Sequence, residues 1–332
     1  MVGAGFTGLA AAVALARAGA SVHVLEASSL GDGASGRSGG LALEGTAFGP
    51  LPGVERCLDV LRACVRDHAI ECHLALGGCW EVRHEPAGEG PGWPDEGAGR
   101  LVVGATVPGG SLDPGALVAG LAAAALRAGA AVHEGARVER FEPGSPSRLY
   151  TAGRRVEAGR VLLAVDALPP ALAPIPGVRP ALTLALATEP LPGGLAAEVG
   201  LGRTPFYTTD LPYLWGRETP GGRLVVGAGL AFDADGDLER VSLAQGDVGE
   251  TFVRLEARVR GLHPALARVR ITHRWGGPIS FRARAPVLAE LAPGVVVAGA
   301  YAGHGVALSF RVAELAAARL LGGDPLPAWG AI

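Results

Sequence analysis

The stretch VGAGFTGLAAAVALARAGASVHVLE, residues 2–26, decides the fold of this chain. It opens with a G-x-G-x-x-G turn, continues with a run of helix-forming residues that ends at Gly19, and closes with an apolar strand that ends at Glu26. A glycine turn between a strand and a helix, with an acid at the end of the next strand, is the pattern of a βαβ unit that binds a dinucleotide. The sequence therefore predicts a Rossmann-type α/β domain at the N-terminus.

Each glycine of this turn has a physical role in binding a dinucleotide. Gly3 permits the tight turn, Gly5 lets the backbone approach the pyrophosphate, and Gly8 lets the helix pack closely on the strand. The helix N-terminus stabilises the anion, and the Glu26 carboxylate is placed to accept hydrogen bonds from a ribose diol. We therefore expect cofactor contacts from Gly3, Gly5, Phe6, Thr7, Gly8, Glu26 and Ala27.

The strand before this turn is short, because only Met1 and Val2 precede the first glycine. A buried parallel strand usually has about five residues. Either the true start lies upstream, or the central strand is a stub with weakened pairing.

Composition excludes several classes of protein. The chain has 332 residues, is 49% apolar and carries a formal net charge of −3 without a basic cluster, which disfavours nucleic acid and anionic membrane surfaces as partners. It contains arginine but no lysine. No uncharged apolar run is long enough to span a bilayer, and no signal peptide is evident, so we expect a soluble cytoplasmic protein.

The four cysteines, Cys57, Cys64, Cys72 and Cys79, follow one another at intervals of seven or eight residues. We attribute this spacing to helical packing, because the tight Cys-x2-Cys pairs of a zinc site are absent. We therefore expect ordinary reduced thiols and no metal site.

A second glycine-rich segment, GDGASGRSGG at Gly31–Gly40, carries a family resemblance. It resembles the corresponding loop of the D-amino-acid oxidase superfamily of flavoproteins, in the branch of glycine oxidase, sarcosine oxidase and gamma-glutamylputrescine oxidase. The resemblance implies that FAD is the cofactor and that this segment, which we call the flavin loop, wraps the pyrophosphate and the edge of the flavin ring. Small residues also let backbone N–H groups converge on an anion, and an arginine adds a charged donor. The residues implied are Ala34, Ser35, Arg37, Ser38, Gly39 and Gly40.

Further segments match the family in the same order. A helix is predicted over residues 114–128, followed by a short strand, and the resemblance places Val138 near the adenine and Ala164 on the diphosphate side. Residues 294–321 predict a strand, a glycine turn and a helix. In the family this helix points its N-terminus at the flavin pyrimidine, where its dipole favours reduction of the ring. The resemblance thus implies contacts from Gly303, His304, Gly305 and Val306.

The middle of the chain predicts an antiparallel sheet. Residues 181–188 and 213–217 have the pattern of strands, a turn at 220–222 predicts a hairpin, and 247–260 form an amphipathic helix. Residues 89–97 are predicted to be a loop. This resembles the substrate sheet of the family, inserted into the Rossmann-type FAD-binding domain.

We therefore expect an α/β fold with a discontinuous FAD-binding domain and an inserted α+β substrate domain. The FAD-binding domain is assigned to residues 1–60, 101–175 and 285–332. The substrate domain is assigned to residues 61–100 and 176–284.

The resemblance implies FAD-dependent oxidation of a small amine or amino acid, with hydride transfer from the carbon bearing the nitrogen to flavin N5. Relatives that clamp a carboxylate often carry Arg where this chain has Ile279, although Arg282 or Arg284 could replace it. Tyr207, Tyr213 and Trp215 are candidate pocket walls, and core packing explains them equally well. The catalytic candidates are His304, Arg282, Arg284 and Tyr213.

Three questions stay open at this level. Some relatives activate oxygen with a lysine, which this chain lacks, so the electron acceptor is oxygen or another molecule, and the enzyme is an oxidase or a dehydrogenase. A catalytically degenerate or partner-dependent FAD-binding protein is the first alternative. A nicotinamide-dependent dehydrogenase is the second, because the N-terminal unit alone serves either dinucleotide.

Overall fold

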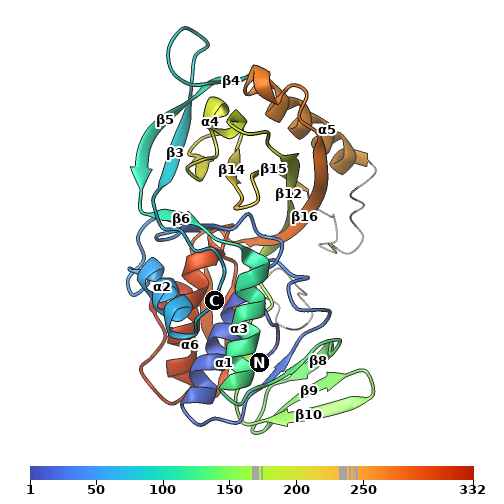
Figure 1. Ribbon diagram of the computed structural model, residues 1–332. Helices are drawn as coiled ribbons and strands as arrows, with labels where there is room; N and C mark the ends of the chain where they lie inside the picture. The colour runs from blue at the N-terminus through green and yellow to red at the C-terminus, as the bar shows by residue number, and fades with distance from the viewer. Residues whose placement is uncertain (167–171, 173–174, 232–237, 239–240, 242, 244–245) are drawn as a thin grey trace.

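The computed structural model describes residues 1–332 except 167–171, 173–174, 232–237, 239–240, 242 and 244–245. Figure 1 shows two parts stacked on one another: a lower part with α1, α2, α3 and α6, and an upper part built on a large sheet beside α5. Both chain termini lie in the lower part. The two ends of the chain are therefore brought together in one part, and the middle of the chain builds the other.

The lower part contains a mostly parallel sheet, and a single residue, Val2, joins its two groups of strands. Val2 forms parallel bridges to Leu25 on one side and to Leu163 on the other, and its N–H donates to the Leu162 carbonyl at 2.9 Å. Val2 alone therefore occupies the central position of the sheet in this structure. The order across the sheet is β7 (Ala131–His133), β1 (His23–Leu25), Val2, β11 (Val161–Leu163), β18 (Val295–Gly299) and β17 (Val287–Ala292).

Helices pack against this sheet through apolar side chains. The aromatic rings of Phe6 and Phe310 lie 6.2 Å apart between α1 and α6, and Leu9 and Leu121 are fully buried. Asp113 begins α3 by accepting a hydrogen bond from the Ala116 N–H at 2.9 Å, which satisfies a free N–H of the first turn. The helices are α1 (Phe6–Arg17), α2 (Cys57–Asp67), α3 (Pro114–Arg127) and α6 (Gly305–Leu320), with the short η3 (Ala328–Gly330) near the C-terminus.

Two small antiparallel sheets complete the lower part. A meander contains β8 (Val138–Glu142), β9 (Ser147–Thr151) and β10 (Arg154–Ala158), and β2 (Leu41–Leu43) pairs with β6 (Gly109–Ser111).

The upper part is an eight-stranded sheet. Its order is β16 (Ile271–Phe281), β12 (Arg179–Pro190), β15 (Arg223–Ala231), β14 (Trp215–Glu218), β13 (Phe206–Thr208), β3 (Cys79–Glu85), β5 (Gly99–Val107) and β4 (Trp93–Asp95). The helices beside it are α4 (Leu195–Val199), α5 (Gly246–Gly261) and η2 (Pro264–Leu266). All neighbouring strands are antiparallel except β13 and β3, so the predicted antiparallel character holds for most of the sheet.

The two faces of this sheet have different neighbours, because successive side chains of a strand point to opposite faces. On one face, which we call the α5 face, Val82, Phe206 and Val226 form a core with Leu255 and Val259 of α5. The opposite face, which we call the inner face, is turned toward the flavin loop. Its central row consists of Glu81, Tyr207, Trp215, Gly227, Ala185 and Trp275, each the register partner of the next.

Two sequence-based expectations are wrong. Residues 93–95 form β4 within the predicted loop, and Pro94 is tolerated there because β4 is an edge strand, where a missing N–H need not pair. Helical packing explains only part of the cysteine spacing, because Cys79 lies on β3. All four cysteines are free thiols.

The division into domains stays a proposal, and the contacts suggest how to draw it. Residues 57–67 form α2, which packs beside α6 in the lower part, whereas 99–107 form β5 in the large sheet. A division that keeps α2 with the FAD-binding part and β5 with the substrate part agrees with these contacts.

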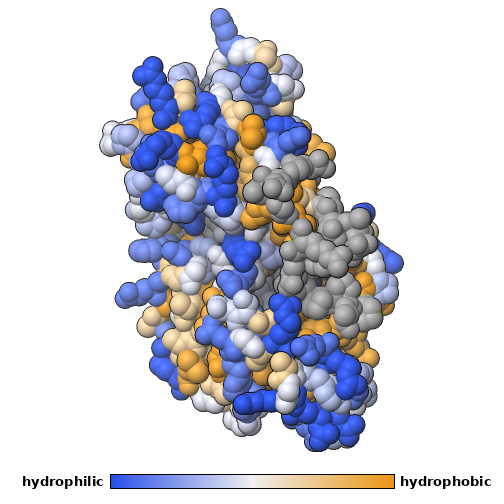
Figure 2. All heavy atoms as spheres, turned by 90° about the vertical axis from the view of Figure 1, so that its right-hand side faces the viewer, coloured by the Kyte–Doolittle hydropathy of each residue, from blue (hydrophilic) through white to orange (hydrophobic). Residues whose placement is uncertain are grey.

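Figure 2 views the side of the molecule on which α5 and β16 lie, and there hydrophilic residues are interspersed with apolar ones. No helix in the described part of the chain is both long and apolar enough to cross a membrane. Among the same residues, no group of three or more His, Cys, Asp or Glu side chains is arranged to hold a metal ion.

Candidate functional site

The first glycine turn is packed so closely that side chains are excluded from it. Gly3 has φ of +95°, and a Cβ there would lie 2.5 Å from the Ala164 carbonyl oxygen. A Cβ on Gly8 would lie 2.0 Å from the Gly3 carbonyl oxygen. The start of α1 is therefore pressed against the ends of the parallel strands, as a dinucleotide turn requires.

The flavin loop is fastened to this helix start. Ser35 Oγ accepts a hydrogen bond from the Phe6 N–H at 2.9 Å, and a Cβ on Gly5 would lie 2.8 Å from the same oxygen. Glu26 accepts one bond from the Ala4 N–H at 2.8 Å and another from the Ser28 N–H at 3.1 Å. A carboxylate has about four acceptor sites, so Glu26 keeps capacity for a ribose diol.

The second helix start lies beside the first. Thr7 Oγ1 of α1 and Tyr301 Oη share a buried hydrogen bond of 2.7 Å, just ahead of α6. The turn that leads into α6 is tight: Ala300, Ala302 and Gly303 have φ of +57°, +50° and +84°. Two helix N-termini, each with free N–H groups and a partial positive charge, therefore meet at one place.

Asp166 holds this turn in place. Its Oδ1 accepts from the Ala300 N–H at 2.8 Å and from Ser280 Oγ at 3.1 Å, while the Ala302 N–H donates to the Ser280 carbonyl at 3.0 Å. Burial raises the pKa of the Asp166 carboxyl to about 6, against the opposing effect of these donors. One carboxyl thus joins the end of β16 to the turn before α6.

His304 immediately precedes α6 and is half-buried. Its Nδ1 lies 3.2 Å from the Ala302 carbonyl, which can only accept, so the N–H is on Nδ1. Burial lowers the pKa of His304, outweighing the carbonyl contact that raises it. A neutral imidazole with this tautomer presents the Nε2 lone pair as an acceptor.

The inner face of the large sheet clamps the flavin loop. Trp275 Nε1 donates to the Arg37 carbonyl at 2.9 Å, and Arg217 Nε donates to the Gly39 carbonyl at 2.5 Å. A Cβ on Gly39 would lie 2.2 Å from the Trp215 ring. Burial lowers the pKa of Arg217, although the charge of Asp113 acts in the opposite direction. The loop expected to line FAD is thus in direct contact with the sheet expected to bind substrate.

The residues in this region fit FAD. Ser38 Oγ, in the middle of the flavin loop, is buried and has no hydrogen-bond partner. A buried hydroxyl without a partner is costly, and an acceptor oxygen of a bound ligand would satisfy it. The tight turns at Gly3 and Gly8 and the spare acceptor capacity of Glu26 favour a dinucleotide in the same place. The remaining predicted contacts also have positions in the structure: Val138 is buried on β8, Ala27 is exposed after β1, Gly40 is buried, and Val306 is buried in the first turn of α6.

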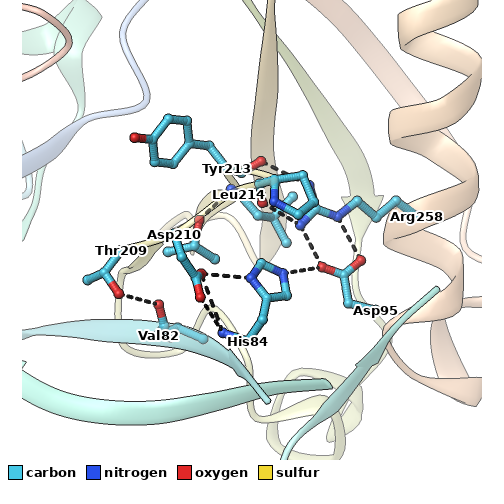
Figure 3. A network of polar contacts seen from close by, with 10 residues as sticks. Val82, His84, Asp95, Thr209, Asp210, Tyr213, Leu214 and Arg258 are labelled. Atoms are coloured by element: carbon cyan, nitrogen blue, oxygen red, sulfur yellow. Dashed lines mark hydrogen bonds and ion pairs between the residues drawn. The ribbon is translucent and has the colours of Figure 1, made fainter. Parts of the chain in front are cut away.

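Three predicted catalytic residues have other surroundings. Arg282 Nη2 donates to the Ala331 carbonyl at 2.6 Å, its Nη1 is buried without a partner, and Arg284 is exposed. The Tyr213 side chain is 55% exposed, and its carbonyl accepts from Arg258 Nη1 at 2.9 Å. Figure 3 shows the Tyr213 ring turned away from the polar network around His84. Their catalytic roles stay predictions, and His304 is the candidate that lies at a helix start of the site.

Several residues of the site were not singled out as cofactor or catalytic residues from the sequence. Arg217 and Trp275 contact the flavin loop across more than 170 positions of sequence, and Asp166 contacts Ala300 across 134 positions. The sequence offered only a local indication, the alternation of polar and aromatic residues with apolar ones on the predicted strands. Such alternation predicts which side chains share a face of the sheet, but not which segment they contact.

Comparisons with known proteins agree with this geometry. The family model described as FAD dependent oxidoreductase matches residues 1–319. The chain is 29% identical to the probable oxidoreductase OrdL of Rhizobium meliloti (strain 1021), over 97% of this chain and 82% of that protein. It is 28% identical to the gamma-glutamylputrescine oxidoreductase of Escherichia coli (strain K12), over 98% of this chain and 83% of that protein.

Among solved structures, the chain is similar in fold to the glycine oxidase from Geobacillus kaustophilus. The TM-score is 0.77 at 20% identity, over 98% of this chain and 94% of that one. The predicted fold class, a Rossmann-type FAD-binding part with a substrate sheet, is confirmed by this likeness, and the predicted family is confirmed by the family model. Because that model covers nearly the whole sequence, the chain belongs to the FAD-dependent oxidoreductases and FAD is its cofactor.

Proposed function

We propose that this protein oxidises a small amine or amino acid by removing a hydride from the carbon that bears the nitrogen. The names of two similar proteins, a gamma-glutamylputrescine oxidoreductase and a glycine oxidase, point to this class of substrate. The observation that carries the proposal is the direct contact of Trp215, Arg217 and Trp275 with the flavin loop. A substrate held on the inner face of the sheet would meet the cofactor there.

When bound, FAD supplies the hydride acceptor at its N5 atom. The protein has to orient the substrate, exclude water and remove a proton, since only a neutral amine releases a hydride readily. The Nε2 lone pair of His304 is the group we assign to accept a proton from the substrate ammonium. The half-buried indoles of Trp215 and Trp275 keep the space beside the flavin loop apolar.

The other contacts in this proposal follow from the sequence pattern and the packing together. Residues 3–8, the flavin loop and the start of α6 would bind the cofactor, with Val138 near the adenine and Ala164 on the diphosphate side. The electron acceptor that reoxidises the flavin is oxygen or another molecule, and reoxidation with and without oxygen would distinguish an oxidase from a dehydrogenase.

The test is to purify the protein, record its visible spectrum, and add a panel of amines and amino acids without oxygen. We expect a flavin spectrum that is bleached by at least one amine. A flavin that no amine bleaches would favour the degenerate or partner-dependent alternative, and a colourless protein that binds NAD would favour the nicotinamide-dependent one.

The role of His304 has its own measurement, the pH dependence of anaerobic bleaching. In the His304→Asn variant, rapid bleaching of the flavin should require a higher pH, because the substrate ammonium must then lose its proton to water. An unchanged pH profile would remove His304 from the reaction.

A further inference from the structure

The central row of the inner face leads from the flavin loop to an acidic side chain. Trp215 of this row contacts Gly39, and the next partners along the row are Tyr207 and then Glu81. Neighbouring strands are about 4.8 Å apart, so Glu81 stands roughly 10 Å from Trp215 along the row. Its carboxylate therefore lies on the same face as the flavin-loop contacts, two strands farther from the loop.

Glu81 is held in position but its charge is not neutralised. The Tyr207 hydroxyl donates to Glu81 Oε1 at 2.6 Å, and both side chains are half-buried. In the described part of the chain, no arginine or histidine forms an ion pair with Glu81. A carboxylate with one hydrogen bond keeps most of its acceptor capacity. Burial, together with the hydrogen bond to Glu81, raises the pKa of Tyr207, so this hydroxyl stays a donor.

Two basic groups on this face, Arg217 and Arg83, already have partners. Arg217, two residues along from Trp215, donates to the Gly39 carbonyl. Arg83, two residues along from Glu81, forms an ion pair with Glu85 at 3.0 Å. A bound molecule would therefore meet a negative charge at Glu81 that has no ion-pair partner among the residues that the structure describes.

The opposite end of the site is apolar. Ile279 Cδ1 would lie 3.3 Å from a Cβ built on Gly303, so an aliphatic side chain fills the space next to the turn before α6. A substrate carboxylate finds no charged partner at Ile279, whereas a substrate ammonium finds one at Glu81.

We propose that Glu81, positioned by Tyr207, binds a second positively charged group of the substrate, at the end away from the carbon that is oxidised. The preferred substrate class is then an amine with a remote ammonium, as in a diamine. This inference rests on the proposed amine oxidation. Tyr207 is a positioning residue, and Glu81 determines specificity through a charged hydrogen bond.

The test compares 1,5-diaminopentane with pentylamine, which have the same chain length but differ in the remote ammonium. The FAD-loaded protein is mixed anaerobically with each, and the half-saturating concentration for flavin bleaching is measured. We expect a value at least about 10-fold lower for the diamine, since 1.4 kcal/mol corresponds to tenfold. In Glu81→Gln the diamine should lose this advantage to within about twofold.

Glu189→Gln is the matched control, because Glu189 lies on β12 of the same sheet but its carboxylate is paired with Arg270, away from Glu81. This variant should keep the diamine preference. Tyr207→Phe should weaken the preference without abolishing it, because Glu81 remains but is no longer held.

The outcomes separate this inference from the proposed function. Equal half-saturation by both amines in the unaltered protein would overturn the inference and leave amine oxidation standing. If neither amine bleaches the flavin, amine oxidation by this panel fails, and calorimetric binding of 1,5-diaminopentane then decides the inference. Binding that is lost in Glu81→Gln would support it, and equal binding by both proteins would overturn it.

Discussion

The two faces of the eight-stranded sheet use charged residues in opposite ways. On the α5 face, Asp95 is bound by Arg258 Nε at 2.8 Å and by His84 Nε2 at 2.8 Å, and His84 Nδ1 contacts Asp210 at 2.7 Å (Figure 3). On the inner face, Glu81 has a tyrosine hydroxyl as its partner and no cation among the described residues. A charge whose partners are all inside the protein contributes to stability, whereas a charge with spare capacity is suited to bind a ligand.

The network on the α5 face also fixes a loop of the sheet. Arg258 donates through its Nη atoms to the carbonyls of Pro212 and Tyr213, each at 2.9 Å. The hairpin between β13 and β14 is thereby attached to α5. The hydrogen bonds of this network hold the fold together. Substitutions on the α5 face should therefore change the free energy of unfolding more than they change FAD binding.

The largest expected effect is on stability, from Arg258→Met. Asp95, whose side chain is 1% exposed, would lose its guanidinium partner and keep only His84. Removing one partner of a buried ion pair costs about 3–5 kcal/mol, and we expect the lower end, measured as the urea-induced free energy of unfolding. Arg254→Met is the control, since Arg254 lies on the same helix in an exposed pair with Glu250 at 3.7 Å. Equal free energies of unfolding for the two variants would contradict the claim that the charged network on the α5 face stabilises the fold.

A second effect concerns a buried carboxyl stabilised by hydrogen bonds instead of a cation. Burial raises the pKa of Asp166 from 3.8 to about 6, so the folded protein binds this proton more tightly than the unfolded chain does. The free energy of unfolding should therefore fall as the pH rises from 3.8 to about 6, by at most about 1.4 kcal/mol per unit. Asp166→Asn should lack this contribution. Denaturation curves between pH 4 and 7 check the difference, and parallel profiles would contradict it.

The smallest expected effect is on cofactor affinity, from Gly39→Ala on the flavin loop. The new Cβ would meet the Trp215 ring at 2.2 Å, and overpacking of this kind costs about 1–3 kcal/mol. The dissociation constant for FAD should rise about tenfold, measured by equilibrium dialysis. Gly33→Ala in the same loop is the control, because its Cβ would have no atom within 4 Å. A similar rise of the dissociation constant in both variants would mean that contact between the flavin loop and the sheet does not determine FAD affinity.

The parts of the molecule that could be predicted from the sequence are those that are determined by residues close together in the chain. The turn at residues 2–8 is identified by glycines that contact one another, since a Cβ on Gly8 would strike the Gly3 carbonyl. The hairpin of β14 and β15 follows from a turn between two apolar runs, and the start of α3 follows from Asp113. Each signal lies within a few residues of the structure that it specifies.

The inner face could not be predicted because it depends on register between distant strands. Tyr207 was proposed as a pocket wall, but Glu81, 126 positions away, becomes its partner only when β13 pairs with β3. The three-residue β4 was missed for a related reason. Its Gly- and Pro-rich surroundings favour a loop, and only pairing with β5 makes it a strand.

The division of the lower part between the two ends of the chain has a consequence for synthesis. A chain folds as it leaves the ribosome, from its N-terminus onward. The turn at α1 emerges well before its neighbour α6, because Tyr301, which contacts Thr7, lies 294 positions later in the chain. The nascent chain therefore cannot complete the paired helix starts that face its vitamin-derived cofactor before this distant segment has been made.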